Sequence, residues 1–118
     1  QYRRYLRPTH PQLARVLTDY GGQLVTAGRP QEALPLLEEA FAIQQGELPD
    51  GHWEAGRTRS VLGSCQSALG LPEAEANLEK GFRLLAASRG EAHQQTQLAA
   101  ARLEAHRLAR PSAATRPD

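Results

Sequence analysis

Two stretches of this chain repeat one another: HPQLARVLTDYGGQLVTAGRPQEALPLLEEAF at residues 10–41 and HWEAGRTRSVLGSCQSALGLPEAEANLEKGF at residues 52–82. The residues that recur include the histidines His10, His52 and His93, the glycines Gly21/Gly63 and Gly28/Gly70, and the Glu-Ala pairs at 32–33 and 73–74. The histidines set a period of 42 and then 41 residues. A period of this length is typical of architectures that stack one supersecondary unit on the next.

Each period predicts two helices joined by a short turn. In the first period the apolar residues step by three and four positions, which places them on one side of a helix. They are Leu13, Leu17, Tyr20, Leu24 and Ala27. Gly28 then stands where a left-handed residue ends a helix, and Pro30 stands in the first turn of the next one.

The second helix of the period carries small and large apolar residues on one face. These are Ala33, Leu37, Ala40 and Phe41. Pro35 lies within its first turns, so we expect Pro35 to bend this helix without breaking it. Residues 45–51 are predicted to form a loop from their composition.

The remainder of the chain extends this pattern and predicts an all-α fold. Further helices are expected near 53–69, 72–88 and 91–109. Residues 1–6 are expected to be the last turns of another helix, and 111–118 a disordered tail. The resulting domain covers 1–110, with repeats at about 10–51 and 52–90 and a terminal helix at about 91–109. Strand signals are absent, because β-branched residues are few and do not alternate with polar ones.

Composition excludes several classes of protein. The 118 residues are too few for a (β/α)₈ barrel, which needs about 250. The single cysteine, Cys65, excludes an intrachain disulfide framework and a multi-cysteine metal site. A formal net charge of +1 and six aromatic residues argue against nucleic-acid binding. No apolar run approaches the length of a membrane span, so we expect no membrane contact and a cytoplasmic location.

The pattern of small residues resembles the tetratricopeptide repeat, in its longer form of about 42 residues found in kinesin light chains and many bacterial proteins. The matching residues are Gly21, Ala33 and Ala40 in the first repeat and Gly63, Ala74 and Gly81 in the second. The linker Leu-Arg-Pro-Thr-His-Pro at 6–11 is similar to the one that joins such repeats. The resemblance implies an α-α superhelix of two helix pairs plus a terminal helix. The absence of methionine and the first residue, Gln1, suggest a fragment, which we expect to be the C-terminal part of a bacterial protein.

The second repeat admits two registers for its first helix. The histidines and glycines place Arg59 and Gln66 where Leu17 and Leu24 stand. A slip of one residue instead aligns an apolar set with the first stripe but loses both glycines; that set is Val61, Cys65 and Ala68.

No motif of catalysis or cofactor binding is present, so we predict a non-enzymatic protein without cofactor or metal. Each of His10, His52 and His93 is expected to cap or order an inter-repeat turn, and His106 to face solvent or pack against a neighbour. Cys65 is expected to be a buried, inert thiol. Trp53 is either a recognition aromatic or, preferably, a hydrophobic staple across a helix start.

The resemblance implies that the first helices line a concave groove that binds a peptide or a partner helix. The groove candidates by position are Arg15, Thr18, Asp19, Gly22, Val25, Arg57, Ser60, Ser64 and Ser67. None is Lys or Asn, which argues against the terminal-carboxylate grip of the co-chaperone type, although Arg15 and Arg57 suit an acidic partner. The alternative function is a C-terminal regulatory segment of a larger bacterial signalling enzyme, such as a serine/threonine protein kinase.

Overall fold

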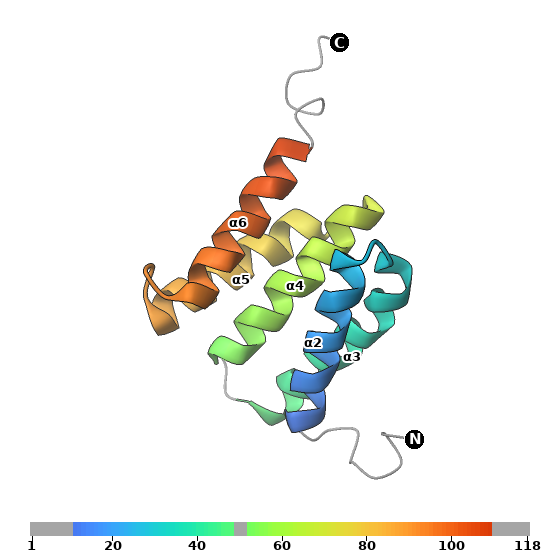
Figure 1. The fold of residues 1–118 in the computed structure, drawn as a ribbon. Helices are drawn as coiled ribbons and strands as arrows, with labels where there is room; N and C mark the ends of the chain where they lie inside the picture. The colour runs from blue at the N-terminus through green and yellow to red at the C-terminus, as the bar shows by residue number, and fades with distance from the viewer. Residues whose placement is uncertain (1–10, 49–51, 110–118) are drawn as a thin grey trace.

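The structure, a computed structural model, describes residues 11–48 and 52–109. These residues form five helices without any strand among them (Figure 1). The helices are α2 (Pro11–Thr26), α3 (Pro30–Glu47), α4 (Trp53–Leu69), α5 (Ala74–Arg89) and α6 (Gln94–Ala109). The prediction of an all-α fold is confirmed for this part of the chain. The expected helix end at 1–6, His10 and the expected tail at 111–118 lie outside the described residues.

The helices are arranged in two layers. In Figure 1, α2, α4 and α6 lie side by side with α4 between the other two, and α3 and α5 lie behind them. The most extensive contacts join α4 to α5 and α2 to α3, so the helices pair as consecutive hairpins. α4 touches all four of the other described helices and is therefore the centre of the structure.

In each helix pair, a glycine of the first helix allows the second helix to approach closely. A Cβ atom on Gly21 would lie 2.7 Å from the side chain of Leu37, and one on Gly63 would lie 2.7 Å from Cγ of Leu78. Both distances are shorter than a Cβ contact tolerates, so only glycine fits these positions without a shift. Ala33 and Ala74 are also completely buried. Small residues therefore lie where the helices of each hairpin pack most closely.

The same contacts decide the register of the second repeat. Leu37 and Leu78 occupy the same place in their two periods, and each meets the glycine of its own pair. The histidine-and-glycine register is therefore the one that the chain adopts. It places Arg59 and Gln66 where the first pair has Leu17 and Leu24.

A hydrogen-bonded set fills those places in the second pair. Arg59 Nε donates to Oδ1 of Asn77 over 3.0 Å, and Asn77 Nδ2 donates to Oε1 of Gln66 over 2.7 Å. Asn77 stands where the first pair has Leu36, which packs against the clusters that hold Leu17 and Leu24. Three apolar residues of one hairpin thus correspond to three mutually satisfied polar residues in the next.

The first helix of each pair ends on a left-handed glycine, as predicted for Gly28. The φ angles of Gly28 and Gly70 are 82° and 72°, which favour glycine over any other residue. The following N–H groups reach back into the last turn, where Arg29 donates to the carbonyl of Leu24 and Leu71 to that of Gln66. Both turns satisfy helix-end carbonyls in the manner of a Schellman motif.

Three helix boundaries differ from the sequence prediction. α3 continues to Glu47, so the loop predicted from residue 45 was wrong for 45–47. Ile43 and Gln44 are buried and hold this turn against the core, while the helical Gly46 costs only about 1 kcal/mol. α5 begins at Ala74 and α6 at Gln94, later than predicted, because turns occupy the residues before them. α3 runs unbroken through Pro35, which lies on its exposed side.

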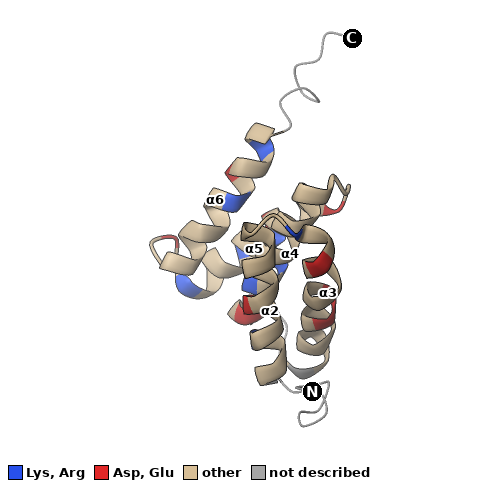
Figure 2. Ribbon diagram, turned by 45° about the vertical axis from the view of Figure 1, so that its right-hand side comes forward, with Lys and Arg blue, Asp and Glu red and all other residues tan. Residues whose placement is uncertain are grey.

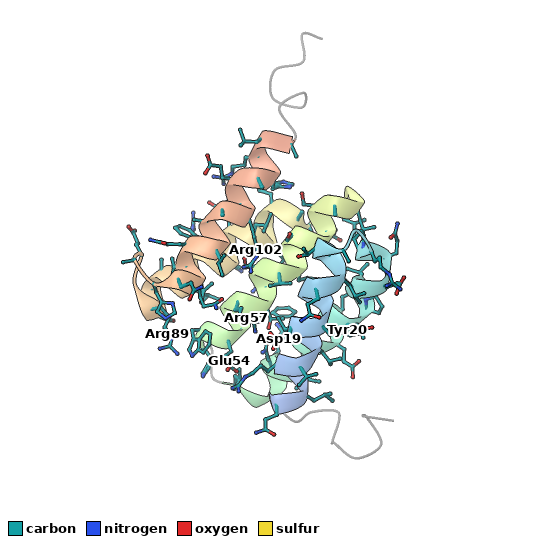
Figure 3. The ribbon with its side chains drawn as sticks, in the orientation of Figure 1. Asp19, Tyr20, Glu54, Arg57, Arg89 and Arg102 are labelled. Carbon is teal, nitrogen blue, oxygen red and sulfur yellow. The ribbon has the colours of Figure 1, made fainter. Side chains whose placement is uncertain are left out.

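Tyr20 corrects the predicted apolar stripe of the first helix. Leu13, Leu17 and Leu24 are buried, but Tyr20 is 53% exposed (Figure 3). Its counterpart in the second pair, Leu62, is buried because α3 packs against α4. No described helix covers α2 on that side, so Tyr20 faces outward.

Candidate functional site

The face formed by α2, α4 and α6 contains two adjoining hollows, which we call the groove. The first has a volume of about 570 Å³ and lies over α2 and α4 as far as Arg102 of α6. The second, of about 450 Å³, lies over α4 and α6 as far as Val25 of α2. Val25, Ser64 and Arg102 line both, so the two hollows are continuous.

Most of the predicted groove residues lie at these hollows. The first hollow is lined by six of them, Thr18, Asp19, Gly22, Val25, Arg57 and Ser64. Ser67 lines the second. Arg15 and Ser60 line neither, and Ser60 is completely buried, which removes its side chain from the surface.

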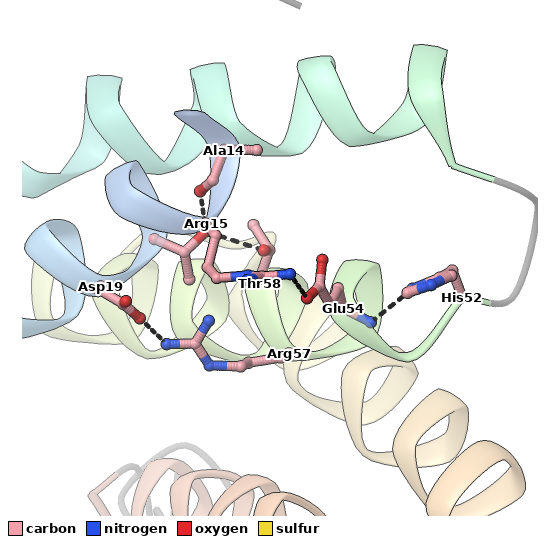
Figure 4. A network of polar contacts seen from close by, with 8 residues as sticks. Ala14, Arg15, Asp19, His52, Glu54, Arg57 and Thr58 are labelled. Atoms are coloured by element: carbon pink, nitrogen blue, oxygen red, sulfur yellow. Dashed lines mark hydrogen bonds and ion pairs between the residues drawn. The ribbon is translucent and has the colours of Figure 1, made fainter. Parts of the chain in front are cut away.

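Two ion pairs join α2 to α4 along one rim of the groove (Figure 4). Arg57 pairs with Asp19, and Nη2 of Arg15 lies 2.6 Å from Oε2 of Glu54. Both arginines were candidates for an acidic partner. Each instead has a carboxylate of this chain beside it, so the pairs fix the spacing of α2 and α4.

The turns before α4 and α6 are capped by histidines, as expected. Nδ1 of His52 accepts a hydrogen bond of 3.1 Å from the N–H of Glu54, and Nδ1 of His93 accepts one of 3.1 Å from the N–H of Gln95. An acceptor at this place satisfies an N–H group that the helix itself leaves unpaired. The capping interpretation is confirmed for these two histidines.

Buried hydroxyl groups form the floor beneath the first hollow. Thr18 borders the hollow but keeps no exposed surface. Its Oγ1 donates to the carbonyl of Ala14 and lies 2.9 Å from Oγ1 of Thr58. Because the Thr18 proton is used on α2, Thr58 supplies the proton of the second bond. Thr18 therefore holds α2 against α4.

His106 connects α6 to both α4 and α5. Its ring is 8% exposed, with Nδ1 2.7 Å from Oγ of Ser67 and Nε2 3.2 Å from Oε1 of Glu75. Nε of Arg107 donates to the other oxygen of Glu75 over 2.8 Å. A pocket of about 440 Å³ borders Ser67, Glu75 and His106 beside the α4–α5 turn. The expectation that His106 faces solvent or packs against a neighbour is resolved in favour of packing.

Arg102 is a groove residue that the sequence prediction omitted. It lines both hollows, is half-buried, and its Nη1 donates to Oγ of Ser60 over 2.9 Å. Burial lowers the pKa of Arg102, and the nearby charge of Arg57 lowers it further. The signal for Arg102 was present, because it follows His93 at the spacing at which Asp19 follows His10. The predicted groove candidates come from the two complete repeats, and Arg102 lies in the terminal helix that follows them.

Cys65 and Trp53 both serve contacts between helices. Cys65 is completely buried, and its Sγ lies 3.2 Å from the carbonyl oxygen of Pro30. Burial raises the pKa of Cys65 to about 11, with a smaller contribution from the charge of Glu38. The guanidinium of Arg89 lies 4.3 Å from the ring centre of Trp53. Trp53 thus ties the start of α4 to the end of α5, a contact that the staple interpretation did not include.

Comparison with known proteins assigns no family: neither a protein-family model nor a curated protein matches this chain. In the ranges 11–48 and 52–109, no three His, Cys, Asp or Glu side chains gather as a metal site would require. None of the five described helices has the length and apolar character to cross a bilayer.

Proposed function

We propose that this chain is a non-enzymatic interaction module of the tetratricopeptide type, which binds an extended peptide or a partner helix in the groove of α2, α4 and α6. In this proposal the hairpins stack with a superhelical turn, so that the first helix of each hairpin lines the concave side. The recurrence of Gly21 as Gly63 and of Ala33 as Ala74 supports this, because the same close contact occurs in both hairpins.

The observation that carries the proposal is the continuity of the groove across three helices. Apolar, hydroxyl and charged groups all reach its surface, through Val25, Ser64 and Arg57. Such a mixture suits a peptide, which offers apolar side chains and polar backbone together. The ion pair of Arg57 with Asp19 joins α4 to α2 at the first hollow, so two of the lining side chains are already paired before a ligand arrives.

The cluster of Ser67, His106 and Glu75 also fits a non-enzymatic role. A serine nucleophile needs a histidine base that is free to exchange protons with substrate. The ring of His106 is buried between Ser67 and Glu75, and Arg107 occupies the other oxygen of Glu75. Holding α6 in place accounts for all of these contacts.

Selection of peptides followed by blockade of the groove tests the proposal. Random twelve-residue peptides displayed on phage are selected on the whole chain, and the affinities of the winners are measured by calorimetry. Ala101→Trp places an indole in the second hollow, since Ala101 is exposed on α6 and lines it. We expect this variant to weaken binding at least about tenfold, because a filled hollow excludes the ligand.

Ala42→Trp is the matched control, because Ala42 is an exposed alanine on α3, in the other layer. We expect it to bind the selected peptides as the wild type does. Equal affinities for both variants, or a selection that yields no peptide above background, would refute the proposed groove recognition.

A further inference from the structure

A separate hollow of about 360 Å³ lies between α5 and α6, on the side of α6 that faces away from the groove. Its lining residues are Phe82, Ala100, Leu103, Glu104, Arg107 and Leu108. None of these lines either hollow of the groove. Leu108 is 69% exposed, the highest value among the large apolar residues that the structure describes. This side of α6, which we call the outer face, therefore presents apolar surface together with two charged groups.

The repeat shows what normally covers the outer face of a first helix. Glu104 stands where the two complete repeats have Gly21 and Gly63, since all three follow the repeat histidine by 11 residues. Those glycines lie against Leu37 of α3 and Leu78 of α5, the second helices of their hairpins. Among the described helices none takes the equivalent place beside α6, which lies at the edge of the row α2–α4–α6 in Figure 1. The outer face is thus a side on which a helix packs elsewhere in this chain.

Glu104 determines what kind of helix can pack on the outer face. Its side chain is exposed and makes no hydrogen bond or ion pair with the described residues. A leucine in the place of Leu37 or Leu78 would bury this carboxylate without a partner, at a high cost in free energy. A helix that packs there must therefore bring a cation to Glu104.

α6 itself carries such a cation about one helical turn further along. Figure 2 shows acidic and basic residues together on α6. Nε of Arg107 donates to Glu75, and its Nη2 lies 4.0 Å from Glu79, so the guanidinium keeps N–H groups for another acceptor. Glu104 and Arg107 are three residues apart. Two copies of α6 that pack antiparallel about a two-fold axis therefore place Glu104 of each copy level with Arg107 of the other.

We propose that two copies of this chain associate through their outer faces. In this dimer Glu104 of each copy pairs with Arg107 of the other, and both Leu108 side chains are covered. A two-fold interface needs a surface that complements itself, and the order of acid and base along α6 provides it. The groove lies on the opposite side of α6 and stays open, so the proposal does not depend on peptide recognition.

The size of the outer face sets the expected affinity. α6 has 16 residues. A helix of this length is about 24 Å long, and one side of it offers less than the roughly 800 Å² per partner that a stable complex buries. We therefore expect a reversible dimer with a Kd above about 1 µM.

Sedimentation velocity of the whole chain, from about 5 to 500 µM, tests the association. The average mass is expected to rise from that of one chain toward that of two. Leu108→Glu should weaken the association at least about tenfold, because it places a carboxylate in the covered surface. Tyr20→Glu is the matched control and should change nothing, since Tyr20 is an exposed apolar residue at the opposite edge of the row.

Two outcomes of this experiment would overturn the proposal. A chain that stays monomeric at every concentration would leave the outer face to a different occupant. Association that Tyr20→Glu weakens and Leu108→Glu does not would assign the contact to α2.

Charge reversal tests the pairing of Glu104 with Arg107. Glu104→Arg gives a copy with two cations on the outer face, and Arg107→Glu gives one with two carboxylates. Each variant alone should associate at least about tenfold more weakly than the wild type, because both attractive pairs become repulsive. An equimolar mixture should restore the dimer, since each cation then meets a carboxylate, and native mass spectrometry identifies the mixed species by its mass.

A mixture that associates no better than its components would refute the pairing. Circular dichroism controls for the fold, because Arg107→Glu also removes the hydrogen bond to Glu75. If that variant fails to fold, Glu104→Arg and Leu108→Glu still decide, since both change exposed side chains. Wild-type association in both of them would then exclude the outer face as the interface.

Discussion

At the scale of single residues, the glycines within the helices differ in the space available for a side chain. A Cβ on Gly22 would lie 3.5 Å from Cγ1 of Val61, an ordinary contact, whereas one on Gly63 would meet the backbone N of Leu78 at 2.9 Å. Backbone cannot move aside as a side-chain tip can. We therefore expect Gly63→Ala to destabilise the chain by about 1–3 kcal/mol in urea unfolding.

Gly22→Ala is the comparison, and we expect it to stabilise the chain by about 0.5–1 kcal/mol, since alanine favours the helix. Gly21→Ala should fall between the two, because the obstacle there is the flexible end of Leu37. Equal effects of Gly22→Ala and Gly63→Ala would show that the hairpins do not depend on close contact at these glycines.

The thiol of Cys65 makes stability depend on alkaline pH. Its pKa is raised from 9.0 to about 11 in the folded chain, so below pH 9 the thiol is neutral in both states. Between pH 9 and 11 only the unfolded state loses the proton, so the free energy of unfolding falls across this window. The loss is on the order of 2–3 kcal/mol.

Cys65→Ser isolates this effect, because serine keeps a donor for the carbonyl of Pro30 but does not titrate in this range. Unfolding free energies of the two proteins are measured from pH 8 to 11. The wild type should lose stability more steeply than the variant. Parallel profiles would contradict the burial of the thiol.

The residue-level prediction from sequence succeeded where a residue's neighbours lie in its own hairpin. Gly28 is such a case, since a helix end is a local feature. Cys65 was also predicted correctly, from its place on the apolar side of α4, although its partner Pro30 lies in the other hairpin. It failed at Tyr20, because exposure there depends on whether another helix lies beside α2. It also failed at Ser60, whose hydroxyl is covered by Arg102 from a helix 42 residues further along.

At the scale of helices, the two hairpins are held together by different chemistry. The first uses apolar contacts of Leu36, and the second uses hydrogen bonds of Asn77 with Arg59 and Gln66. We expect Asn77→Leu alone to cost about 1–3 kcal/mol, because it leaves a guanidinium N–H and an amide oxygen without partners. Urea unfolding of the variants provides the measurement.

The triple variant Arg59→Leu/Asn77→Leu/Gln66→Leu should recover most of that loss, since it recreates the apolar set of the first hairpin. Leu36→Asn in the first hairpin is the reverse control, and it should destabilise because no partner awaits its amide. A triple variant as unstable as Asn77→Leu would show that the two hairpins do not share one packing plan.

Helix ends were predictable where the sequence carries a specific signal. Gly28, Gly70 and the capping histidines mark such ends, and the structure places turns at each. The composition of residues 45–51 predicts a loop and so ends α3 too early, whereas Gly46 lies inside the helix. The tertiary contacts of Ile43 and Gln44 decide this end, and composition does not encode them.

At the scale of the whole molecule, the groove was predictable only as far as the repeat. Its first two helices followed from positions that recur, such as Arg57 and Ser64. The third helix supplies Arg102, and its distance from α4 depends on how α6 packs, which the period alone does not give. The sequence therefore predicted groove residues on α2 and α4 but none on α6, which supplies Arg102.

The same arrangement predicts an order of local opening. α4 contacts every other described helix, whereas α6 is fixed by one buried face, formed by Thr96, Ala99, Leu103 and His106. In a stack where each unit contacts its neighbours, an end element opens at a lower free energy than a central one. We expect hydrogen exchange, followed by mass spectrometry under native conditions, to be fastest in α6 and slowest in α4.

His106→Ala sharpens this prediction, because it removes the contacts of α6 with Ser67 and Glu75 together. Exchange should accelerate in α6 by an order of magnitude or more while α2 and α3 keep their protection. Leu37→Ala loosens the first hairpin at Gly21, so it should accelerate exchange in α2 and α3 while α6 keeps its protection. If both substitutions accelerate all five helices equally, the chain opens as a single unit. The groove then forms and disappears with the whole fold, and α6 does not open separately from α2 and α4.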